Sequence, residues 1–398
     1  MKKRYSLNEA FKSECKVILD NKGYYGILSF DSEVGCGLSI LGGIGIRNRG
    51  SLEIIRGFLS TGEEFVLYKC IRINFDYFNA PRGFAVDKFQ GTILMIGEEI
   101  NEDLKFKRIT FSTTNSKEFF YESNIEFGQL GDKYKFEVSK LVPIKIVPNN
   151  NRKIDILRVP KMSASNLEGL QAKQICNIQI TSKSRINFLS LLYDLQAVKN
   201  STDLITQSPS NIEFVKLDKV RMLYKPKSML ENIKAGSIPM TRYREVKDIY
   251  RSYLSKFFNS NKEINRSMVE YFSVIHHVNR YGSDNYLSLC RSMEAFHRCT
   301  VKPKMSFKQR VADLLKKYCY GCLLYLKITN INVFSKAVDK YRNSLTHANV
   351  GPFDDVKKNR EIYVLQIQLE AVFSIILLRY FGLPKEMVFE KIGQTFIP

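Results

Sequence analysis

The sequence of 398 residues lacks an apolar run of the ~18–20 residues that a membrane-spanning helix needs. Its best candidate, Ala371 to Leu378, is much shorter and is followed by Arg379. The basic start Met1-Lys2-Lys3-Arg4 precedes polar residues, so no secretory leader is expected. These absences predict a cytoplasmic protein with reduced thiols and without a membrane partner, in which Ala371 to Leu378 belongs to a buried helix.

Histidine is scarce and cysteine is scattered, which argues against a metal site. Among the four histidines, His276 and His277 are adjacent, so on a helix their side chains would point about 100° apart. Only Cys319-Tyr-Gly-Cys322 among the eight cysteines has zinc-ligand spacing, and no second pair of cysteines or histidines lies nearby. We therefore expect no metal and no cofactor, and we expect both cysteines to lie in a helical core.

Acidic residues are the minority charge, with 40 against 61 basic residues and a net charge of +21. Residues 241–398 carry 26 basic and 14 acidic residues, which leaves 35 and 26 for residues 1–240. The positive electrostatic field of such a chain attracts polyanions. Nucleic acid is the leading candidate partner, and an anionic membrane surface is the second. A third reading is that the composition only reflects an AT-biased genome.

The first 225 residues predict β structure. Their short runs rich in Ile, Val, Phe and Tyr are separated by Gly, Asn, Asp and Ser, which is typical of antiparallel sheets in a sandwich or barrel. The runs are Tyr24 to Phe30, Leu38 to Ile40, Leu52 to Ile55, Phe65 to Ile73, Gly83 to Val86, Gly91 to Ile96, Phe106 to Thr110, Tyr134 to Val138, Leu141 to Val147, Ile175 to Ile180 and Phe214 to Tyr224. We expect a helix over Ile186 to Val198 and a polar loop over 199–211. Gly35-Cys-Gly37 and Gly42-Gly43-Ile-Gly45 lack a full nucleotide-binding fingerprint and are expected to be turns.

The pattern changes to long helices from Tyr243 onward. Short connections between them predict an antiparallel bundle, and Ser306 and Gly382-Leu-Pro384 carry start and stop signals. The predicted helices are Arg244 to Phe258, Asn265 to Tyr281, Asp284 to Cys299, Ser306 to Leu326, Asn332 to His347, Arg360 to Phe381 and Pro384 to Lys391. The predicted fold class is α+β, with a β-rich domain over 1–225, a linker over 226–242 and an all-α domain over 243–398.

One polar cluster could support chemistry. Arg342, Asn343 and His347 lie near the end of an otherwise amphipathic helix. Asn343 and His347 are four residues apart and share a face, whereas Arg342 and His347 are about 140° apart on an ideal helix. A histidine can move the proton during attack of a 2′-hydroxyl on the adjacent phosphate, and an arginine can hold that phosphate. A nucleic-acid-binding surface without chemistry and a purely structural helix end are the other two readings.

Arg342-Asn343-x-x-x-His347 resembles the signature of HEPN ribonucleases, and its surroundings resemble an ApeA-like HEPN domain over roughly 245–390. The likeness extends to Leu289 to His297, which includes Glu294, to Ser306 to Leu315, to Lys336 to His347 and to Gln366 to Gly382. The Gly23-Tyr-Tyr-Gly26-Ile-Leu run is similar to the opening of the ApeA N-terminal domain, with two tyrosines where tryptophan is expected.

The resemblance implies a metal-independent endoribonuclease that dimerises, or forms higher oligomers, through its HEPN bundle. It also implies an anti-phage role by abortive infection, with tRNA as the expected RNA partner. Arg342 and His347 would be catalytic, Asn343 would be the intervening polar residue, and Glu294 would be a supporting residue. The N-terminal domain would be a sensor that keeps the nuclease idle until a phage protein or nucleic acid binds.

Arg291 and His297 also satisfy a loose Arg-gap-His pattern, but we interpret His297 as a surface or partly buried residue whose replacement by alanine is nearly silent for cleavage.

The main alternative function is a non-catalytic RNA- or protein-binding sensor module of a defence system. A toxin of a toxin–antitoxin pair is a third, and the ~200 additional N-terminal residues argue against it.

Overall fold

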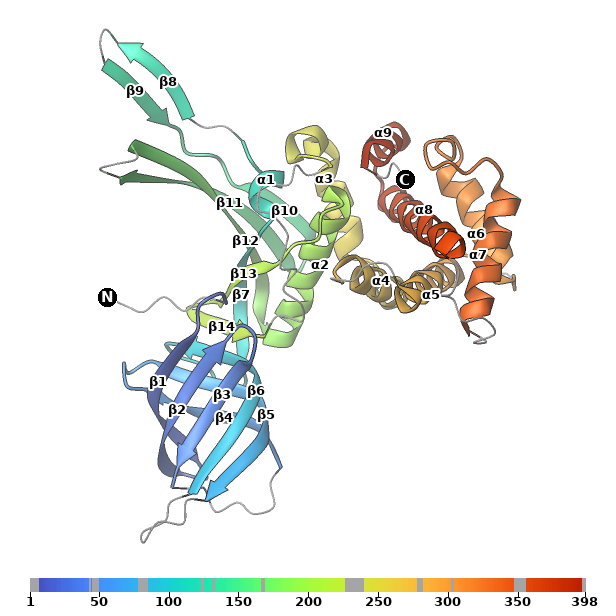
Figure 1. Cartoon of the computed structure of the whole chain (residues 1–398). Helices are drawn as coiled ribbons and strands as arrows, with labels where there is room; N and C mark the ends of the chain where they lie inside the picture. The colour runs from blue at the N-terminus through green and yellow to red at the C-terminus, as the bar shows by residue number, and fades with distance from the viewer. Residues whose placement is uncertain are drawn as a thin grey trace.

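The computed structural model describes residues 7–42, 44, 50–77, 85–122, 125–130, 133–165, 169–225, 240–277, 282–301, 304–346 and 356–395. Within these residues the N-terminal part is built of strands and the C-terminal part of helices, so the predicted α+β class is confirmed (Figure 1).

Strands β1 to β6 form a closed antiparallel barrel. Around the ring the order is β6-β3-β2-β1-β4-β5, and β5 pairs back onto β6, which closes the barrel. Inward-facing side chains such as Phe30, Leu38, Leu67 and Phe89 fill it, each nearly inaccessible to solvent. The strands are β1 (Phe11–Leu19), β2 (Lys22–Asp31), β3 (Gly35–Leu41), β4 (Ser51–Leu59), β5 (Glu64–Tyr77) and β6 (Ala85–Gly97). Of the two predicted architectures, the barrel is therefore the one that forms here.

Beyond the barrel the same hydrogen-bonded sheet continues from β6 in the order β14-β13-β7-β12-β11-β10, and we call these six antiparallel strands the second sheet. Helix α2 packs on β7 and β12, between this sheet and the C-terminal helices (Figure 1). The elements are β7 (Lys105–Thr113), α1 (Ser116–Phe119), β10 (Ile144–Asn149), β11 (Arg152–Ser165), β12 (Gly169–Asn187), α2 (Phe188–Thr206), β13 (Ile212–Leu217) and β14 (Val220–Tyr224). A separate hairpin is formed by β8 (Ile125–Leu130) and β9 (Lys133–Val138).

The C-terminal part consists of packed helices that share a core with the second sheet. One continuous cluster of buried apolar residues runs from Val66 to Ile392, and α3 packs on both α2 and β10. The helices are α3 (Tyr243–Phe258), α4 (Lys262–Ile275), α5 (Ser283–Thr300), α6 (Phe307–Leu314), the π-helical turn η1 (Leu315–Cys319), α7 (Ile331–Thr346), α8 (Val356–Tyr380) and α9 (Lys385–Thr395).

Aromatic side chains join the two parts. Phe119 at the end of α1 and the following Phe120 contact Tyr243 and Tyr250 of α3, with ring centroids 5.4 Å apart for Phe119 and Tyr250. The predicted linker 226–242 lies largely outside the described residues. Its last residues are packed, because the Met240 backbone N–H donates to the Thr206 carbonyl oxygen at 3.1 Å and Thr241 is buried.

Several local predictions were wrong in extent. Helix α2 reaches Thr206, so most of the predicted loop 199–211 is helix; its polar side chains are satisfied by buried partners. The predicted helix Ser306 to Leu326 ends early, because a π-helical turn follows α6 and Gly321 adopts a φ of +100° that interrupts a helix. Gly35-Cys-Gly37 begins strand β3, although Gly35 itself has a φ of +101° that suits the preceding turn.

The helix boundaries with clear sequence signals agree with the structure. Ser306 caps α6 in a capping box with Gln309, and Gly382, two residues after the end of α8, has a φ of +102°. Arg360–Tyr380 of α8, with a mean hydropathy of 1.7, is long and apolar enough to cross a membrane, whereas we expected no such segment. Since 61% of that apolar window is buried inside the protein, as in the core helix of a soluble protein, this is weak evidence for a membrane span.

Candidate functional site

The C-terminal candidate site is centred on Arg342 in helix α7. Phe334 and Val338 are buried, and four-residue steps along a helix bring Arg342 onto the same face. The Arg342 Nη2 lies 2.8 Å from Glu294 Oε2 on α5, and its guanidinium carbon lies 4.5 Å from the centre of the Phe307 ring on α6. The Arg342 side chain is 27% exposed. Its guanidinium therefore contacts residues of α5 and α6 while part of it stays accessible to solvent.

Glu294 is shared by two arginines. Its Oε1 accepts from Arg298 Nη2 at 2.6 Å and its Oε2 from Arg342, so one carboxylate faces two guanidinium groups. Helix α7 is further fixed to α5 because the Tyr286 hydroxyl donates to the Val338 carbonyl oxygen at 2.9 Å and its ring packs edge-on against Tyr341.

The structure places the other predicted site residues differently. Asn343 is exposed, and its amide nitrogen lies 3.5 Å from Asp339 Oδ2, one turn earlier on the same helix. His347 follows the last residue of α7 and lies outside the described residues. The tertiary fold thus brings together Arg342 and Glu294, which are 48 residues apart in the sequence and lie on different helices.

His297 is fully buried, which corrects our expectation of a surface or partly buried residue. Its Nδ1 lies 2.9 Å from Arg310 Nη1 and its Nε2 lies 3.0 Å from Asp313 Oδ2. An arginine can only donate, so Nδ1 accepts and Nε2 carries the hydrogen that is donated to Asp313. His297 is therefore a neutral connector between α5 and α6, and Arg291 pairs with Glu270 on the exposed side of α5.

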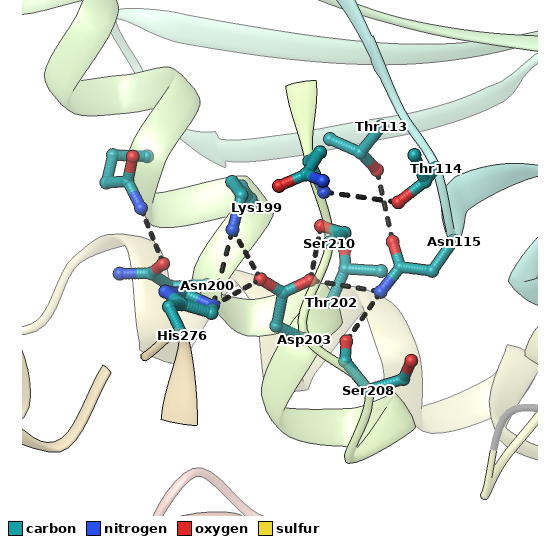
Figure 2. Close-up of polar contacts among 12 residues, drawn as sticks. Thr113, Thr114, Asn115, Lys199, Asn200, Thr202, Asp203, Ser208, Ser210 and His276 are labelled. Atoms are coloured by element: carbon teal, nitrogen blue, oxygen red, sulfur yellow. Dashed lines mark hydrogen bonds and ion pairs between the residues drawn. The ribbon is translucent and has the colours of Figure 1, made fainter. Parts of the chain in front are cut away.

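A second polar cluster, which the sequence reading missed, surrounds Asp203 near the end of α2. Figure 2 shows its carboxylate with Lys199 and His276 on one side and Asn115 and Ser210 on the other. The Asp203 Oδ2 accepts from Lys199 at 2.6 Å and contacts His276 Nε2 at 2.8 Å, while Oδ1 accepts from Asn115 at 3.0 Å and Ser210 at 2.6 Å. The cluster connects the end of α4 to α2 and to the turn before α1.

Electrostatics keep Asp203 ionised. Burial alone would raise the pKa of its carboxyl, but the Lys199 ammonium and the hydrogen-bonded His276 lower that pKa to about 2. His276 also stacks on Phe272, with ring centroids 5.8 Å apart, so its ring is packed as well as hydrogen-bonded. The four-residue spacing of Lys199 and Asp203 was the available sequence signal, since it suits a helical ion pair.

Within the described part of the chain, no group of three or more His, Cys, Asp or Glu side chains is arranged to hold a metal ion. Cys319 and Cys322 are both buried, as predicted. The Cys319 thiol lies 3.9 Å from the Val372 carbonyl oxygen, and burial raises its pKa well above the ordinary value.

Comparison with known proteins identifies the family. The ApeA N-terminal domain 1 matches residues 18–273, which is more than half of the chain and extends through α3 into α4. The match does not cover the helices that carry Glu294 and Arg342. No curated protein and no solved structure matches the chain. This match over the barrel, the second sheet and the first two helices of the C-terminal part shows that the chain belongs to the ApeA family of anti-phage defence proteins.

Proposed function

We propose that this protein is a metal-independent HEPN endoribonuclease that acts in abortive infection, with tRNA as its expected substrate. The observation that carries the proposal is the state of Arg342. Its guanidinium is held by Glu294 at 2.8 Å and by the Phe307 ring, yet it remains partly exposed. A pre-oriented, accessible guanidinium suits recognition of a phosphate and of the charge that develops on it during cleavage.

In the proposed reaction, the ribose 2′-oxygen forms a bond to the adjacent phosphorus and the bond from phosphorus to the 5′-oxygen breaks. The proton leaves the 2′-hydroxyl and a proton reaches the 5′-oxygen, which gives a 2′,3′-cyclic phosphate and a 5′-hydroxyl. His347 would transfer the protons and Arg342 would bind the non-bridging oxygens. Asn343 would contribute a polar contact, and a homodimer formed through the helical part would bring two such sets together.

A second function, an RNA- or protein-binding sensor module without cleavage, is favoured by one specific contact. The Glu294 carboxylate already occupies one edge of the Arg342 guanidinium, so a phosphate must use the remaining donors or displace it. If Glu294 holds Arg342 permanently, the site would bind an anion weakly and would not stabilise a transition state.

The test is cleavage of total tRNA by purified full-length protein to which extract of phage-infected cells is added as the source of the trigger, with fragment ends sequenced and their phosphates identified. We expect discrete fragments with cyclic phosphate ends from the wild type and from His277→Ala and Arg291→Ala, which are exposed controls matched in residue type. His347→Ala and Arg342→Ala should yield no fragments. In infected cells, intact RNA together with full protection from phage would overturn the nuclease and leave the binding module.

A further inference from the structure

The segment between α6 and α7 carries an unusual combination of charge and exposed aromatic residues. Residues 314–338 contain four lysines and no acidic residue. We define the basic-aromatic surface as the exposed residues of this segment and its preceding turn: Lys316, Lys317, Tyr320, Leu324, Tyr325 and Lys327. Tyr320 is 70% exposed and Tyr325 is 61% exposed, so both rings present most of their surface to solvent.

This surface is held in place by anchors underneath it. Cys319, Cys322, Leu326 and Ile328 are buried between the exposed residues, and successive backbone hydrogen bonds, such as Tyr325 N–H to the Cys322 carbonyl oxygen at 3.1 Å, form consecutive turns. Two side chains of helix α8 also bind the backbone of the segment. Arg379 donates to the Tyr318 carbonyl oxygen at 2.9 Å, and Gln368 donates to the Leu326 carbonyl oxygen at 2.8 Å.

Another cation reaches the same place from α9. Gly321 has a positive φ, and Lys385 Nζ lies 3.2 Å from where a β-carbon at Gly321 would be, so the ammonium group covers the glycine. Lys385 also lies over the Phe389 ring at 5.5 Å. The neighbouring Glu386 is about 100° away around α9. Basic groups from two separate parts of the chain therefore converge beside the exposed tyrosines.

The position of the surface relative to Arg342 follows from α7. Helix α7 begins at Ile331, four residues after Lys327, and 11 residues at ~1.5 Å rise place Arg342 roughly 16 Å from Ile331 along the helix axis. That distance corresponds to about five stacked nucleotides at ~3.4 Å each. A strand lying on the surface could therefore continue to the phosphate-binding arginine.

We propose that the basic-aromatic surface binds a single-stranded segment of RNA, with bases stacked on Tyr320 and Tyr325 and phosphates next to the lysines. Exposed aromatic rings within a positive groove or face are the usual means of holding single strands without sequence preference. The lack of acidic residues over 25 consecutive positions favours a polyanion over a protein partner of mixed charge. The inference rests on the proposed function for the identity of the Arg342 site, and it extends that function to a substrate with an unpaired region.

The test measures binding apart from cleavage. Full-length Arg342→Ala protein is titrated into a fluorescently labelled, unstructured oligoribonucleotide, and anisotropy gives the dissociation constant. Adding Tyr320→Ala and Tyr325→Ala should weaken binding at least tenfold, because each stacked base contributes a several-fold factor or more. Tyr193→Ala, a 63% exposed tyrosine on α2, is the matched control and should leave affinity unchanged.

Salt dependence tests the lysines. Loss of two phosphate contacts in Lys316→Gln/Lys317→Gln should reduce the slope of log K against log salt by about 1.4, from ~0.7 per contact for single strands. The control pair Lys105→Gln/Lys219→Gln, exposed lysines of the β-rich part, should not change the slope.

Each remaining outcome decides the question. Unchanged affinity in all variants overturns the proposal. If the tyrosine variants keep their RNA affinity but no longer form a dimer by light scattering, the proposal is overturned and the surface contacts a second copy of the chain. If they keep their RNA affinity but no longer bind anionic vesicles, the proposal is overturned and the surface contacts a membrane. RNA binding that depends on the tyrosines while His347→Ala still cleaves would support this surface and overturn the proposed catalytic residues. Normal RNA binding in the tyrosine variants, together with loss of cleavage in His347→Ala, would overturn this surface and support the proposed catalytic residues.

Discussion

Glu294 on α5 and Arg342 on α7 are joined by an ion pair with a nitrogen–oxygen distance of 2.8 Å, and the Glu294 side chain is the less exposed of the two, at 16% against 27%. The same carboxylate also binds Arg298 at 2.6 Å. Glu294 therefore orients the Arg342 guanidinium and determines which of its N–H groups remain free to bind a phosphate. A conservative change at Glu294 should alter the site without removing its arginine.

Glu294→Gln keeps an oxygen that can accept from Arg342 but removes the negative charge. We expect Arg342 to bind phosphate more tightly in this variant and to be less well oriented, so KM for RNA should fall while kcat falls about tenfold. Steady-state cleavage kinetics at several RNA concentrations measure both constants. Glu270→Gln, which removes the partner of the exposed Arg291, is the control. Identical kinetics in Glu294→Gln and wild type would contradict a positioning role for Glu294.

His297→Ala should destabilise the protein, although the sequence reading expected it to be nearly silent for cleavage. The change leaves the buried Arg310 without its acceptor and Asp313 without a donor. An unpaired buried charge costs about 3 kcal/mol, which corresponds to a fall in Tm of roughly 4 °C for an unfolding entropy of ~2.1 cal/mol/K per residue over the whole chain. Thermal unfolding followed by circular dichroism measures the shift, with the exposed His277→Ala as control. A Tm equal to that of the wild type would refute a stabilising role for the contacts of His297 with Arg310 and Asp313.

Asp203 should contribute to stability in a way that depends on pH. Its pKa is about 2 in the folded protein and ~3.9 when unfolded, so its contribution is present above about pH 4 and is lost as the pH falls toward 2. The difference corresponds to about 2–3 kcal/mol.

Urea unfolding at a series of pH values should show this dependence as a difference between wild type and Asp203→Asn. The difference in unfolding free energy should be largest near neutral pH and should shrink below pH 4. Asp103→Asn, an exposed carboxyl paired with Lys105, should unfold like the wild type at each pH. A difference between wild type and Asp203→Asn that is constant with pH would mean that Asp203 does not titrate as stated.

Deletion of residues 1–225 should yield an aggregated protein. If the β-rich part acted only as a sensor, its deletion would alter toxicity or trigger dependence, but the helices share one apolar core with the second sheet. The deletion would uncover Tyr250 and Tyr253 of α3, both fully buried in the intact chain. Size-exclusion chromatography of the fragment 226–398 measures the outcome. A monodisperse helical fragment would show that the helical part folds without the β-rich part, and it would then be suitable for activity tests.

Cleavage should continue in millimolar EDTA. The proposed reaction uses the 2′-hydroxyl as nucleophile, a histidine for proton transfer and an arginine for charge, so no step needs a bound cation. Parallel digests with EDTA and with EDTA plus excess Mg²⁺ separate a catalytic effect from the effect of Mg²⁺ on RNA folding. Strong inhibition by EDTA on an unstructured substrate would rule out the metal-free mechanism.

Local signals in the sequence were sufficient for the α+β class and for several boundaries. The capping box at Ser306 and the positive φ at Gly382 depend on a few neighbouring residues, and both were predicted from those residues. Cys319 and Cys322 were likewise expected in the core because they lie in an apolar stretch. These features were predictable since their physical causes act within one or two turns of the chain.

The sequence by itself thus determined the order of strands and helices, the excess of positive charge and the candidate motif at Arg342. Tertiary structure decided that β5 pairs with β6 to close a barrel, that Glu294 binds Arg342, and that Asp203 and His297 are buried with partners. The physical reason is distance along the chain. A polar residue is stable in the interior only when its partners arrive from other elements, and the local pattern around Asp203 or His297 does not say which residues those are.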